Sequence, residues 1–365
     1  MFFQSIGLAW MLFASCTNYK STNQEHADDL VRTDQSTTVD TTLHLKFTSG
    51  IRAIFEDSNG NLWFGSHGEG VARYDGNKIT YFTTQGGLSH NQVRTIKQDA
   101  YGKVWFECGK GLSYYDGFGI SSYTARDYSA KDEWNISSND IWFKGDEEIG
   151  FNGKEKRPGA YRFDGHKMTF QAFPVQVDNS EVDKYSVFAS IIKGKDNTVW
   201  FPTFGAVIGY DGDSFTVIDN TRLQLDASTG YLHVRSIFED SQENLWIGNN
   251  GIGVLKYDGD TTINVSKLYG LVHNNSEHSG HASPPGSLEH VFAIAEDKEG
   301  DIWFGDRDTG AWRFDGTSFE NFTSEDGLTS THVWTIYKDK REEMWFGLAD
   351  GSVVKFNGES FDKIF

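Results

Sequence analysis

The sequence predicts an all-β protein, a single seven-bladed β-propeller of four-stranded antiparallel blades. A tryptophan recurs about every 40 to 60 residues along the 365-residue chain, which is typical of propeller blades. An aromatic-Asp-Gly or aromatic-Asn-Gly turn follows each of these tryptophans. The seven tryptophans are Trp63, Trp105, Trp142, Trp200, Trp246, Trp303 and Trp345. The seven turns begin at Tyr74, Tyr115, Phe163, Tyr210, Tyr257, Phe314 and Phe356.

The second repeat shows how one unit supplies four strands. Residues 93–98 alternate and are rich in β-branched side chains, so they predict an inner strand. Residues 103–107, which carry the tryptophan, and residues 112–115 predict the next two strands. The glycine of the following Asp116-Gly117 accepts a positive φ and predicts a hairpin turn to an outer strand at 120–124.

The third repeat and the closure of the ring are less regular. The inner strand expected near residues 134–136 lacks the Val-Arg-x-Ile pattern of the other repeats. Residues 360–365 predict an outer strand for the seventh blade. Residues 43–47 resemble an outer strand too, and either pair beside the seventh blade and latch the ring or lead into the first.

The N-terminus predicts an exported chain. Residues 6–14 form an apolar run that is too short to span a bilayer and fits a secretory signal. The run ends in Phe13-Ala14-Ser15-Cys16, which resembles the bacterial lipoprotein box. We therefore expect a lipoprotein-type signal peptide at 1–16 with lipidation at Cys16, an ordinary cleaved signal being the alternative. The polar residues 17–42 predict a flexible tether, and residues 43–365 the propeller. The expected location is the periplasm or the outer membrane, with no membrane attachment besides the lipid.

Composition excludes one class of partner. The chain has 33 basic and 52 acidic residues, a net charge of −19, whereas a nucleic-acid partner favours a basic surface. Its two cysteines, Cys16 and Cys108, leave no disulfide within the mature chain. We expect no cofactor and a monomer.

Strand order assigns the loops to two faces. We call face one the side on which each inner strand begins, and face two the opposite side. Face-two turns are short, as in Asp57–Gly60, whose recurrence between the same strands favours a β-turn over a calcium site. The long insertions all fall on face one, at 125–134, 144–159, 174–185, 219–231 and 267–289. Long loops on a rigid scaffold commonly carry binding sites, so we expect function on face one.

Three histidines occupy equivalent positions in three adjacent repeats. His233, His290 and His332 each stand immediately before the first residue of an inner strand, where the first two repeats have Gly50 and Gln92. Such positions ring the mouth of the channel, so the histidines predict an anion, sugar or metal site there. The alternative is a polar residue at a strand start with local hydrogen bonds.

A histidine-rich loop follows the fifth repeat. His273, His278 and His281 are plausible metal ligands, but they form no compact ligand pattern, and a solvated loop is the simpler interpretation. Whether a metal binds is left open.

Other face-one residues have the composition of a sugar pocket, in which rings stack on the apolar face and polar groups bind hydroxyls. The links after the tryptophan strands supply His67, Glu69, Asn249, Asp306 and Arg307, with Gln92 at the channel mouth. Trp134 and Tyr231 supply the rings.

The repeats resemble the two-component-regulator propeller family, in which a Val-Arg-x-Ile strand precedes Leu-Trp-(Phe/Ile)-Gly and then Tyr-Asp-Gly. Residues 234–237, 244–248 and 257–259 match in one unit, and 321–323 and 326–328 in another. The resemblance implies a periplasmic ligand-sensing propeller of the kind found in hybrid sensor kinases, often in carbohydrate uptake. This chain differs in having one ring and no kinase region.

We therefore expect an exported propeller of sensor type that binds a carbohydrate, another small ligand or a partner protein on face one. The alternatives are a periplasmic lyase or hydrolase that uses the histidine cluster, and a protein-interaction platform. No Gly-x-Ser-x-Gly, His-Glu-x-x-His or phosphate-loop motif is present, which favours binding over catalysis.

Overall fold

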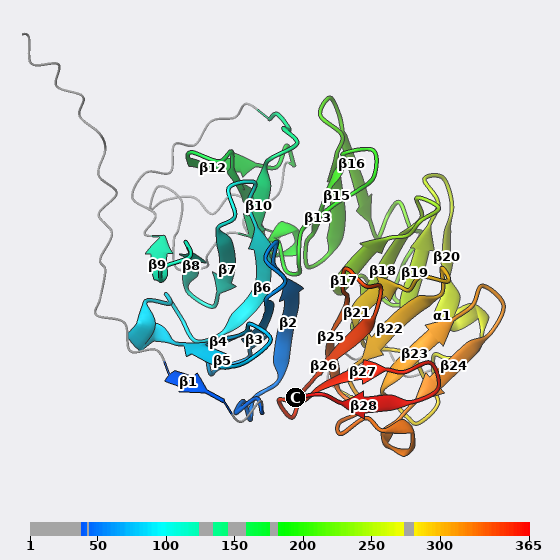
Figure 1. The fold of residues 1–365 in the computed structure, drawn as a ribbon. Coiled ribbons are helices and arrows are strands. Elements are labelled where there is room, and N and C mark those ends of the chain that lie inside the picture. Colours follow the sequence, from blue (N-terminus) through cyan, green and yellow to red (C-terminus); the bar gives the residue numbers. More distant parts are fainter. Residues whose placement is uncertain (1–37, 42–43, 124–133, 145–157, 176–181, 274–280) are drawn as a thin grey trace, which may run out of the picture. The chain divides into compact units, whose positions relative to one another are not determined.

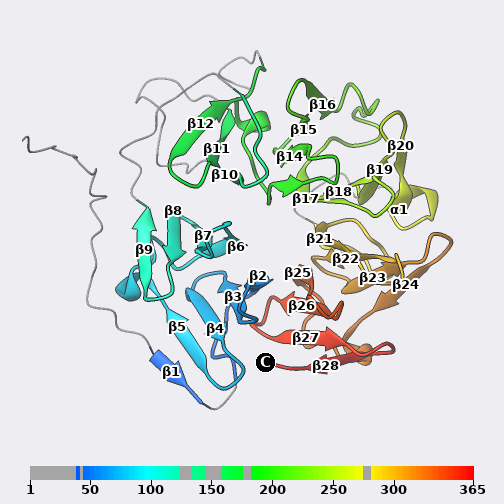
Figure 2. The ribbon, with the colours of Figure 1, turned by 45° about the horizontal axis from the view of Figure 1, so that its top comes forward.

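The computed structural model describes residues 38–41, 44–123, 134–144, 158–175, 182–273 and 281–365. These residues belong to one compact unit, and their strands form seven antiparallel sheets (Figure 1). The sheets follow one another along the chain as the blades of a propeller, which confirms the predicted fold (Figure 2). Inner strands contact one another between the first and second, the fifth and sixth, and the sixth and seventh blades, and the seventh blade contacts the first.

The strands fall into four classes by their place in a blade. The inner strands are β2 (Ile51–Glu56), β6 (Val93–Gln98), β13 (Ile192–Lys193), β17 (Val234–Glu239), β21 (Val291–Glu296) and β25 (Val333–Lys338). The tryptophan strands are β3 (Leu62–Ser66), β7 (Val104–Cys108), β10 (Ile141–Lys144), β14 (Val199–Pro202), β18 (Leu245–Asn249), β22 (Ile302–Asp306) and β26 (Met344–Leu348). The third strands are β4 (Val71–Tyr74), β8 (Gly111–Tyr115), β11 (Gly159–Phe163), β15 (Ala206–Tyr210), β19 (Val254–Tyr257), β23 (Ala311–Phe314) and β27 (Val353–Phe356). The outer strands are β5 (Ile79–Phe82), β9 (Ile120–Tyr123), β12 (Met168–Ala172), β16 (Phe215–Asp219), β20 (Thr262–Asn264), β24 (Phe319–Phe322) and β28 (Phe361–Lys363).

Short helical turns connect some of these strands. The 3-10 turns at Thr84–Gly86 and Ser324–Asp326 each end at a glycine with positive φ, 104° at Gly87 and 101° at Gly327. A Cβ at Gly327 would lie 2.3 Å from the carbonyl oxygen of Phe361, so a side chain there would clash. The others are a 3-10 turn at Val182–Tyr185 and α1 (Val265–Leu268). None of the described helices is both long and apolar enough to cross a bilayer.

The hydrophobic core lies between the blades. Buried apolar residues of the described chain form seven clusters, each shared by two neighbouring blades. Trp63, for example, is fully buried and packs with Val93 and Phe106 of the next blade. The repeated tryptophans therefore hold adjacent blades together, since burial of large aromatic surfaces is strongly favourable.

The Asp-x-x-Gly turns are part of the same core. Asp57 accepts hydrogen bonds from the backbone N–H groups of Asn59 and Asn61 and from the indole N–H of Trp63, at 2.8 to 3.0 Å. The same aspartate-to-indole bond recurs from Asp99 to Trp105, Asp240 to Trp246, Asp297 to Trp303 and Asp339 to Trp345. Because these carboxylates serve the turn and the tryptophan, the turns fit the predicted β-turn rather than calcium binding.

The third blade has three strands among the described residues, β10, β11 and β12, so the regular inner strand is missing there. In the first, fifth, sixth and seventh blades the second residue after the tryptophan is glycine, against which the next inner strand lies. A Cβ at Gly65 would be 2.9 Å from Cγ1 of Val93. The second blade, which has no such neighbour, carries Glu107 at this position, and Glu107 Oε1 accepts the backbone N–H of Lys144 in β10 at 2.6 Å.

A half-buried lysine completes this edge. Lys97 Nζ donates to the carbonyl oxygen of Trp142 in β10 at 2.6 Å and to that of Ile191 at 3.1 Å. The carbonyl group of Trp142 and the backbone N–H of Lys144 point to the same edge of β10. In a regular blade the inner strand would form hydrogen bonds with this edge. The side chains of Lys97 and Glu107 thus replace backbone hydrogen bonds of the missing strand.

The ring closes through side-chain packing. β1 (Thr38–Asp40), which falls within the segment expected to be a tether, pairs with β5 as a fifth strand of the first blade. Residues 44–47 form no strand and lead into the first blade, and the seventh blade takes its outer strand from β28, as predicted. Phe47 and Phe365 are buried in the cluster between the first and seventh blades.

Candidate functional site

A β-bulge recurs near the start of five inner strands. The pairing with the tryptophan strand shifts register between the first and third residues of β2, β6, β17, β21 and β25. A bulged residue has no partner in the ladder, and its side chain is re-aimed. The five bulged residues are Arg52, Arg94, Arg235, Phe292 and Trp334, and all five line one cavity.

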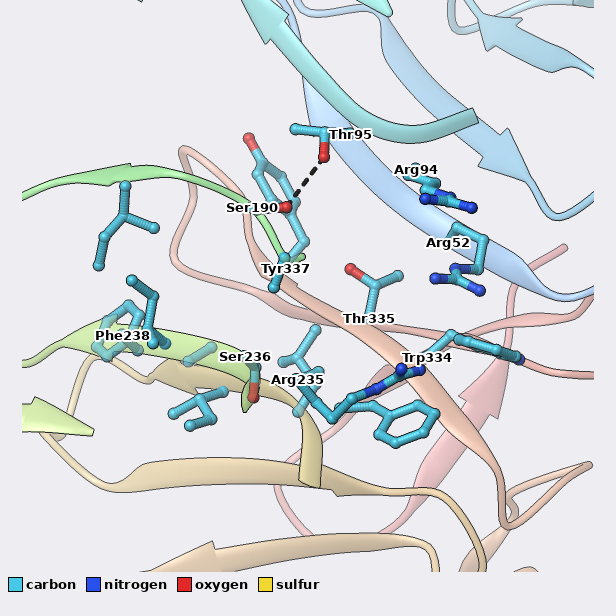
Figure 3. Close-up of a pocket in the computed structure, with 18 of the residues that line it drawn as sticks. Arg52, Arg94, Thr95, Ser190, Arg235, Ser236, Phe238, Trp334, Thr335 and Tyr337 are labelled. Atoms are coloured by element: carbon cyan, nitrogen blue, oxygen red, sulfur yellow. Dashed lines mark hydrogen bonds between the residues drawn. The ribbon is translucent and has the colours of Figure 1, made fainter. Parts of the chain in front are cut away.

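This cavity lies between the inner strands and has a volume of about 660 Å³. Such a volume suits a small ligand. Figure 3 shows Arg52, Arg94, Arg235 and Trp334 toward one end of it, while Phe238 lies at the other end. Between them the hydroxyl groups of Thr95 and Ser190 lie 3.0 Å apart.

The guanidinium groups are held against aromatic rings. Arg52 lies over the ring of Trp334 at 3.8 Å, and Arg235 lies over that of Phe292 at 4.1 Å and near that of Phe188 at 5.0 Å. Such cation–π contacts orient a guanidinium without consuming its N–H donors. Burial, followed by repulsion from the other arginines, lowers the pKa of Arg52 to about 9 and that of Arg235 to about 10, so both remain cationic at neutral pH.

Two of the predicted site residues line the cavity. The ring of His67 stacks on that of Trp334 with centroids 5.7 Å apart. Its Nδ1 lies 3.4 Å from a terminal nitrogen of Arg52 and 3.5 Å from Nε2 of Gln92. The side-chain oxygen of Gln92 accepts from Arg94 Nε at 2.7 Å. Burial and the nearby charges of Arg52 and Arg94 lower the pKa of His67.

The three predicted histidines support the cavity wall. They do not line the cavity themselves. The residues two positions after them, Arg235, Phe292 and Trp334, line it. His332 stacks on Trp334 with centroids 4.4 Å apart, and His233 lies 4.2 Å from the ring of Phe204. His290 is buried, with 1% of its surface exposed.

Each of these histidines keeps one buried ring nitrogen without a hydrogen-bond partner in the described structure, Nε2 in His233 and His332 and Nδ1 in His290. Burial is the largest cause that lowers the pKa of all three to about 4. They are therefore neutral at neutral pH and poorly matched to act as general bases there.

Three other predicted residues fix loop backbones. Asn249 is fully buried, and its side-chain oxygen accepts the backbone N–H of His233 at 3.1 Å. Asp306 is also fully buried and accepts the backbone N–H of His290 at 2.9 Å and that of Asp308 at 2.7 Å, while burial raises its pKa to about 6.

Glu69 accepts the backbone N–H groups of Thr48 and Ser49 at 2.8 and 2.7 Å. These bonds fix the segment that leads into the first blade. Burial is the largest single influence on the pKa of Glu69 and raises it, but the hydrogen bonds from Ser49 and Thr48 together lower the pKa by more, so the net shift is downward.

The remaining predicted residues lie outside the cavity. Arg307 forms an ion pair with Asp308 at 2.8 Å. Trp134 stacks on Trp142 with centroids 5.4 Å apart and packs between the third and fourth blades, so the expectation that its ring is presented to a ligand is not met. Tyr231 is 57% exposed but is not part of the cavity lining.

The histidine-rich loop is only partly described. His273 Nδ1 lies 3.2 Å from Oε1 of Glu289. His278, like Cys16, lies outside the described residues. Within the described ranges, no three His, Cys, Asp or Glu side chains come together as a metal site.

Sequence reasoning missed the residues that form most of the mouth, namely Arg52, Arg94, Phe188, Arg235, Phe292 and Trp334. The Val-Arg-x-Ile pattern was a signal for three of them, since it places an arginine where a strand of the core would have an apolar or neutral residue. The sequence predicts the mouth two positions earlier, at His233, His290 and His332.

Comparisons with known proteins agree with this architecture. Residues 46–68, 230–251 and 285–308 match the family model described as two component regulator propeller. No curated protein matches the sequence. The extracellular domain of the putative hybrid two component system BT4673 from B. thetaiotaomicron is similar in fold, with 18% identity and a TM-score of 0.60 over 86% of this chain and 39% of that one.

The corresponding domain of BT3049 from the same organism is 18% identical, with a TM-score of 0.63 over 87% of this chain and 40% of that one. This chain thus spans less than half the length of these domains. A catalytically inactive virginiamycin B lyase from Staphylococcus aureus, solved with quinupristin, is also 18% identical, with a TM-score of 0.60 over 87% of this chain and 98% of the lyase. Three segments of the chain therefore match the two component regulator propeller model, and its seven-bladed fold is similar to that of these extracellular domains.

Proposed function

We propose that this chain is an exported binding module of sensor type, and that its central cavity takes up a small ligand, with a carbohydrate as the leading class. The observation that carries the proposal is the set of bulged residues. One position, repeated in five blades, supplies two aromatic rings and three cations to a single cavity of about 660 Å³.

The asymmetry of this set supports recognition rather than a structural role. The core positions of the blades repeat almost unchanged, as the buried Trp63, Trp105, Trp246 and Trp303 show. The bulged position changes from arginine in the first, second and fifth blades to phenylalanine and tryptophan in the sixth and seventh. A repeated scaffold with a varied lining provides different contacts to the two ends of a ligand.

We also propose that the mature chain is anchored by a lipid on Cys16, as the sequence Phe13-Ala14-Ser15-Cys16 after an apolar run indicates. Expression in a bacterial host with radiolabelled palmitate, followed by membrane fractionation, tests this. Labelling and membrane association that Cys16→Ser abolishes are expected. A chain that is exported unlabelled would show an ordinary cleaved signal instead.

Ligand binding is tested by thermal shift against a library of oligosaccharides and small metabolites, with hits confirmed by isothermal titration calorimetry. A ligand at 100 times its Kd stabilises the folded state by about 2.7 kcal/mol, which is a measurable rise in Tm. The variant Ser190→Trp places a large ring inside the cavity and is expected to abolish binding. The matched control is Asn77→Trp, at an exposed position in a face-two turn.

Both variants must show the circular dichroism spectrum and a Tm close to those of the wild type. Binding that survives Ser190→Trp would contradict the central cavity as the site. If no small ligand binds and affinity capture returns a stoichiometric protein whose binding Ser190→Trp leaves unchanged, the interaction-platform alternative replaces this proposal.

A further inference from the structure

Three arginines of the cavity form no ion pair with a described carboxylate, although the chain has a net charge of −19 and Glu107 and Glu296 line the same cavity. Arg52, Arg94 and Arg235 all line the cavity. In the described chain no carboxylate lies within ion-pair distance of any of the three; Arg162 and Arg313, by contrast, pair with Asp140 at 2.6 Å and with Glu320 at 2.5 Å.

The hydrogen-bonding capacity of these arginines is largely unused. The side chain of Arg235 makes no hydrogen bond with any described residue, and that of Arg52 has only the 3.4 Å contact with His67. Arg94 uses its Nε for Gln92. A guanidinium carries five N–H donors in one plane, so stacking on Trp334 or Phe292 leaves the edge of the group available to a bidentate acceptor.

Like charges in one half-buried cavity repel one another. Repulsion among the arginines contributes, after burial, to lowering the pKa of Arg52 and Arg235. An anion placed among them would relieve this repulsion and supply acceptors for the unused donors. The two carboxylates of the cavity accept backbone N–H groups instead, Glu107 from Lys144 and Glu296 from Ser241, and neither pairs with the arginines, which leaves this role to a ligand.

An apolar surface adjoins the cations. Phe188 lies beside Arg235 and has its ring 5.5 Å from that of Phe204. Their exposed fractions, 38% and 37%, are high for phenylalanine in this protein. A ligand with a ring next to its charged group would contact both features at once.

We propose that the ligand is a small organic anion with a ring, such as an acidic sugar, and that Arg52, Arg94 and Arg235 bind its carboxylate or sulfate group. This inference rests on the proposed function and narrows the class of ligand. Two sources share the chemistry, a carboxylate and a sulfate ester, and the experiment separates them.

Isothermal titration calorimetry of the full chain with three probes tests the proposal. Phenyl β-D-glucuronide and phenyl β-D-glucoside differ only in the carboxylate, and phenyl sulfate carries the other anion. At least one anionic probe is expected to bind 10-fold or more tightly than the glucoside, with an affinity that falls as NaCl rises from 20 to 500 mM. The stronger of the two anionic probes identifies the source.

Variants assign the effect to the arginines. Arg52→Gln and Arg235→Gln each remove one cation and are expected to weaken the anionic probe 10-fold or more, with little effect on the glucoside. Arg341→Gln is the matched control, because this arginine is 74% exposed in a face-two turn. Circular dichroism and Tm verify that each variant is folded.

The outcomes distinguish this inference from the proposed function. If a ligand whose binding depends on Ser190 is neutral and is unaffected by Arg52→Gln and Arg235→Gln, the anion inference is wrong and the central binding site stands. If the glucoside binds as tightly as the glucuronide and phenyl sulfate does not bind, the inference is also wrong. If neither the probes nor any library compound binds in a manner that Ser190→Trp blocks, both proposals fail.

Discussion

The carboxylate of Glu239 accepts the indole N–H of Trp200 at 2.9 Å, so a residue of the fifth blade completes the hydrogen bonding of the fourth. Five other blades use an aspartate six residues before the tryptophan. The fourth blade has Gly194 at that place, and a Cβ there would lie 2.4 Å from Glu239 Oε2. A side chain at position 194 would therefore clash with the Glu239 carboxylate. The glycine at 194 leaves room for Glu239 to accept the N–H of the partly buried Trp200 indole.

We therefore expect Glu239→Ala to lower the free energy of unfolding by about 2 kcal/mol, because it leaves the Trp200 indole and the backbone N–H of Lys195 without their acceptor. Gly194→Asp alone is expected to destabilise as well, through the clash and the repulsion between carboxylates. Combined with Glu239→Ala it restores the arrangement of the other blades and part of the stability. A double-mutant cycle from urea unfolding measures the coupling energy between positions 194 and 239. If the losses of the two single variants simply add in the double variant, an aspartate at 194 does not replace Glu239.

The edge of the third blade gives a second prediction. Lys97→Met removes the donor to the carbonyl groups of Trp142 and Ile191 and is expected to cost about 2 kcal/mol, since buried acceptors are left unpaired. Lys363→Met, at an exposed position in β28, is the control and should change the stability by less than about 0.5 kcal/mol. Equal Tm values for the two variants would show that Lys97 does not replace a strand.

Acid sensitivity follows from the three histidines. In the folded state the pKa values of His233, His290 and His332 are each lowered to about 4, mainly by burial. In an unfolded chain the pKa of histidine is about 6.5. Between these values the unfolded state holds more protons, so the free energy of unfolding falls as the pH falls from 6.5 to 4. Each histidine contributes a slope of up to about 1.4 kcal/mol per pH unit.

Urea unfolding at several pH values between 7 and 4.5 measures this slope. Neighbouring charges shift the histidine pKa values in both directions. Arg235 and Arg307 disfavour the imidazolium form and lower the pKa, whereas Asp308 favours it and raises the pKa of His290. His332→Gln is expected to make the slope shallower, whereas His166→Gln, at an exposed turn, should not. An unchanged slope in His332→Gln would mean that this ring is not buried in its neutral form.

The last residue of the chain is expected to stabilise the closure of the ring. Phe365 is 7% exposed, and its ring lies 5.1 Å from those of Phe64 and Tyr74 in the first blade. Phe365→Ala should cost about 3 kcal/mol of stability in urea unfolding. Phe118→Ala removes the same atoms from a side chain that is 90% exposed and should be nearly neutral. Similar losses of stability in the two variants would show that Phe365 does not stabilise the contact between the seventh and first blades.

The sequence allowed the fold to be predicted because the fold is periodic. Each blade repeats the buried tryptophan and the Asp-Gly turn, and seven copies leave little choice of architecture. The irregular third repeat was also visible, since residues 134–136 lack the inner-strand pattern. The side chains that replace the inner strand could not be predicted. Lys97 and Glu107 belong to the second blade, and no local sequence pattern indicates their contacts with β10.

The residues expected to form the site and the residues of the cavity overlap only in part, since His67 and Gln92 are the ones that belong to both sets. The expectation is that the residue before each inner strand rings the channel mouth. The bulged residues line the cavity instead, because a bulge re-aims a side chain that has no partner in the ladder, and no local pattern shows where a bulge forms. His233, His290 and His332 stand two positions earlier and do not line it. Gln92 precedes its inner strand as the histidines do, yet it lines the cavity, so the position before a strand does not by itself decide which side chain reaches the cavity.

The recurring bulge also separates two demands on the same strand. Residues such as Ile51 and Ala53 pair with the neighbouring strand and are tied to the core, while Arg52 between them has no pairing partner. A change at one of the five bulged positions therefore breaks no pairing of the ladder, although it alters the ring and cation contacts of the cavity. Relatives that share this ring are then free to diverge in what they recognise by changing a handful of codons, and a library randomised at these positions is a route to binders of new specificity.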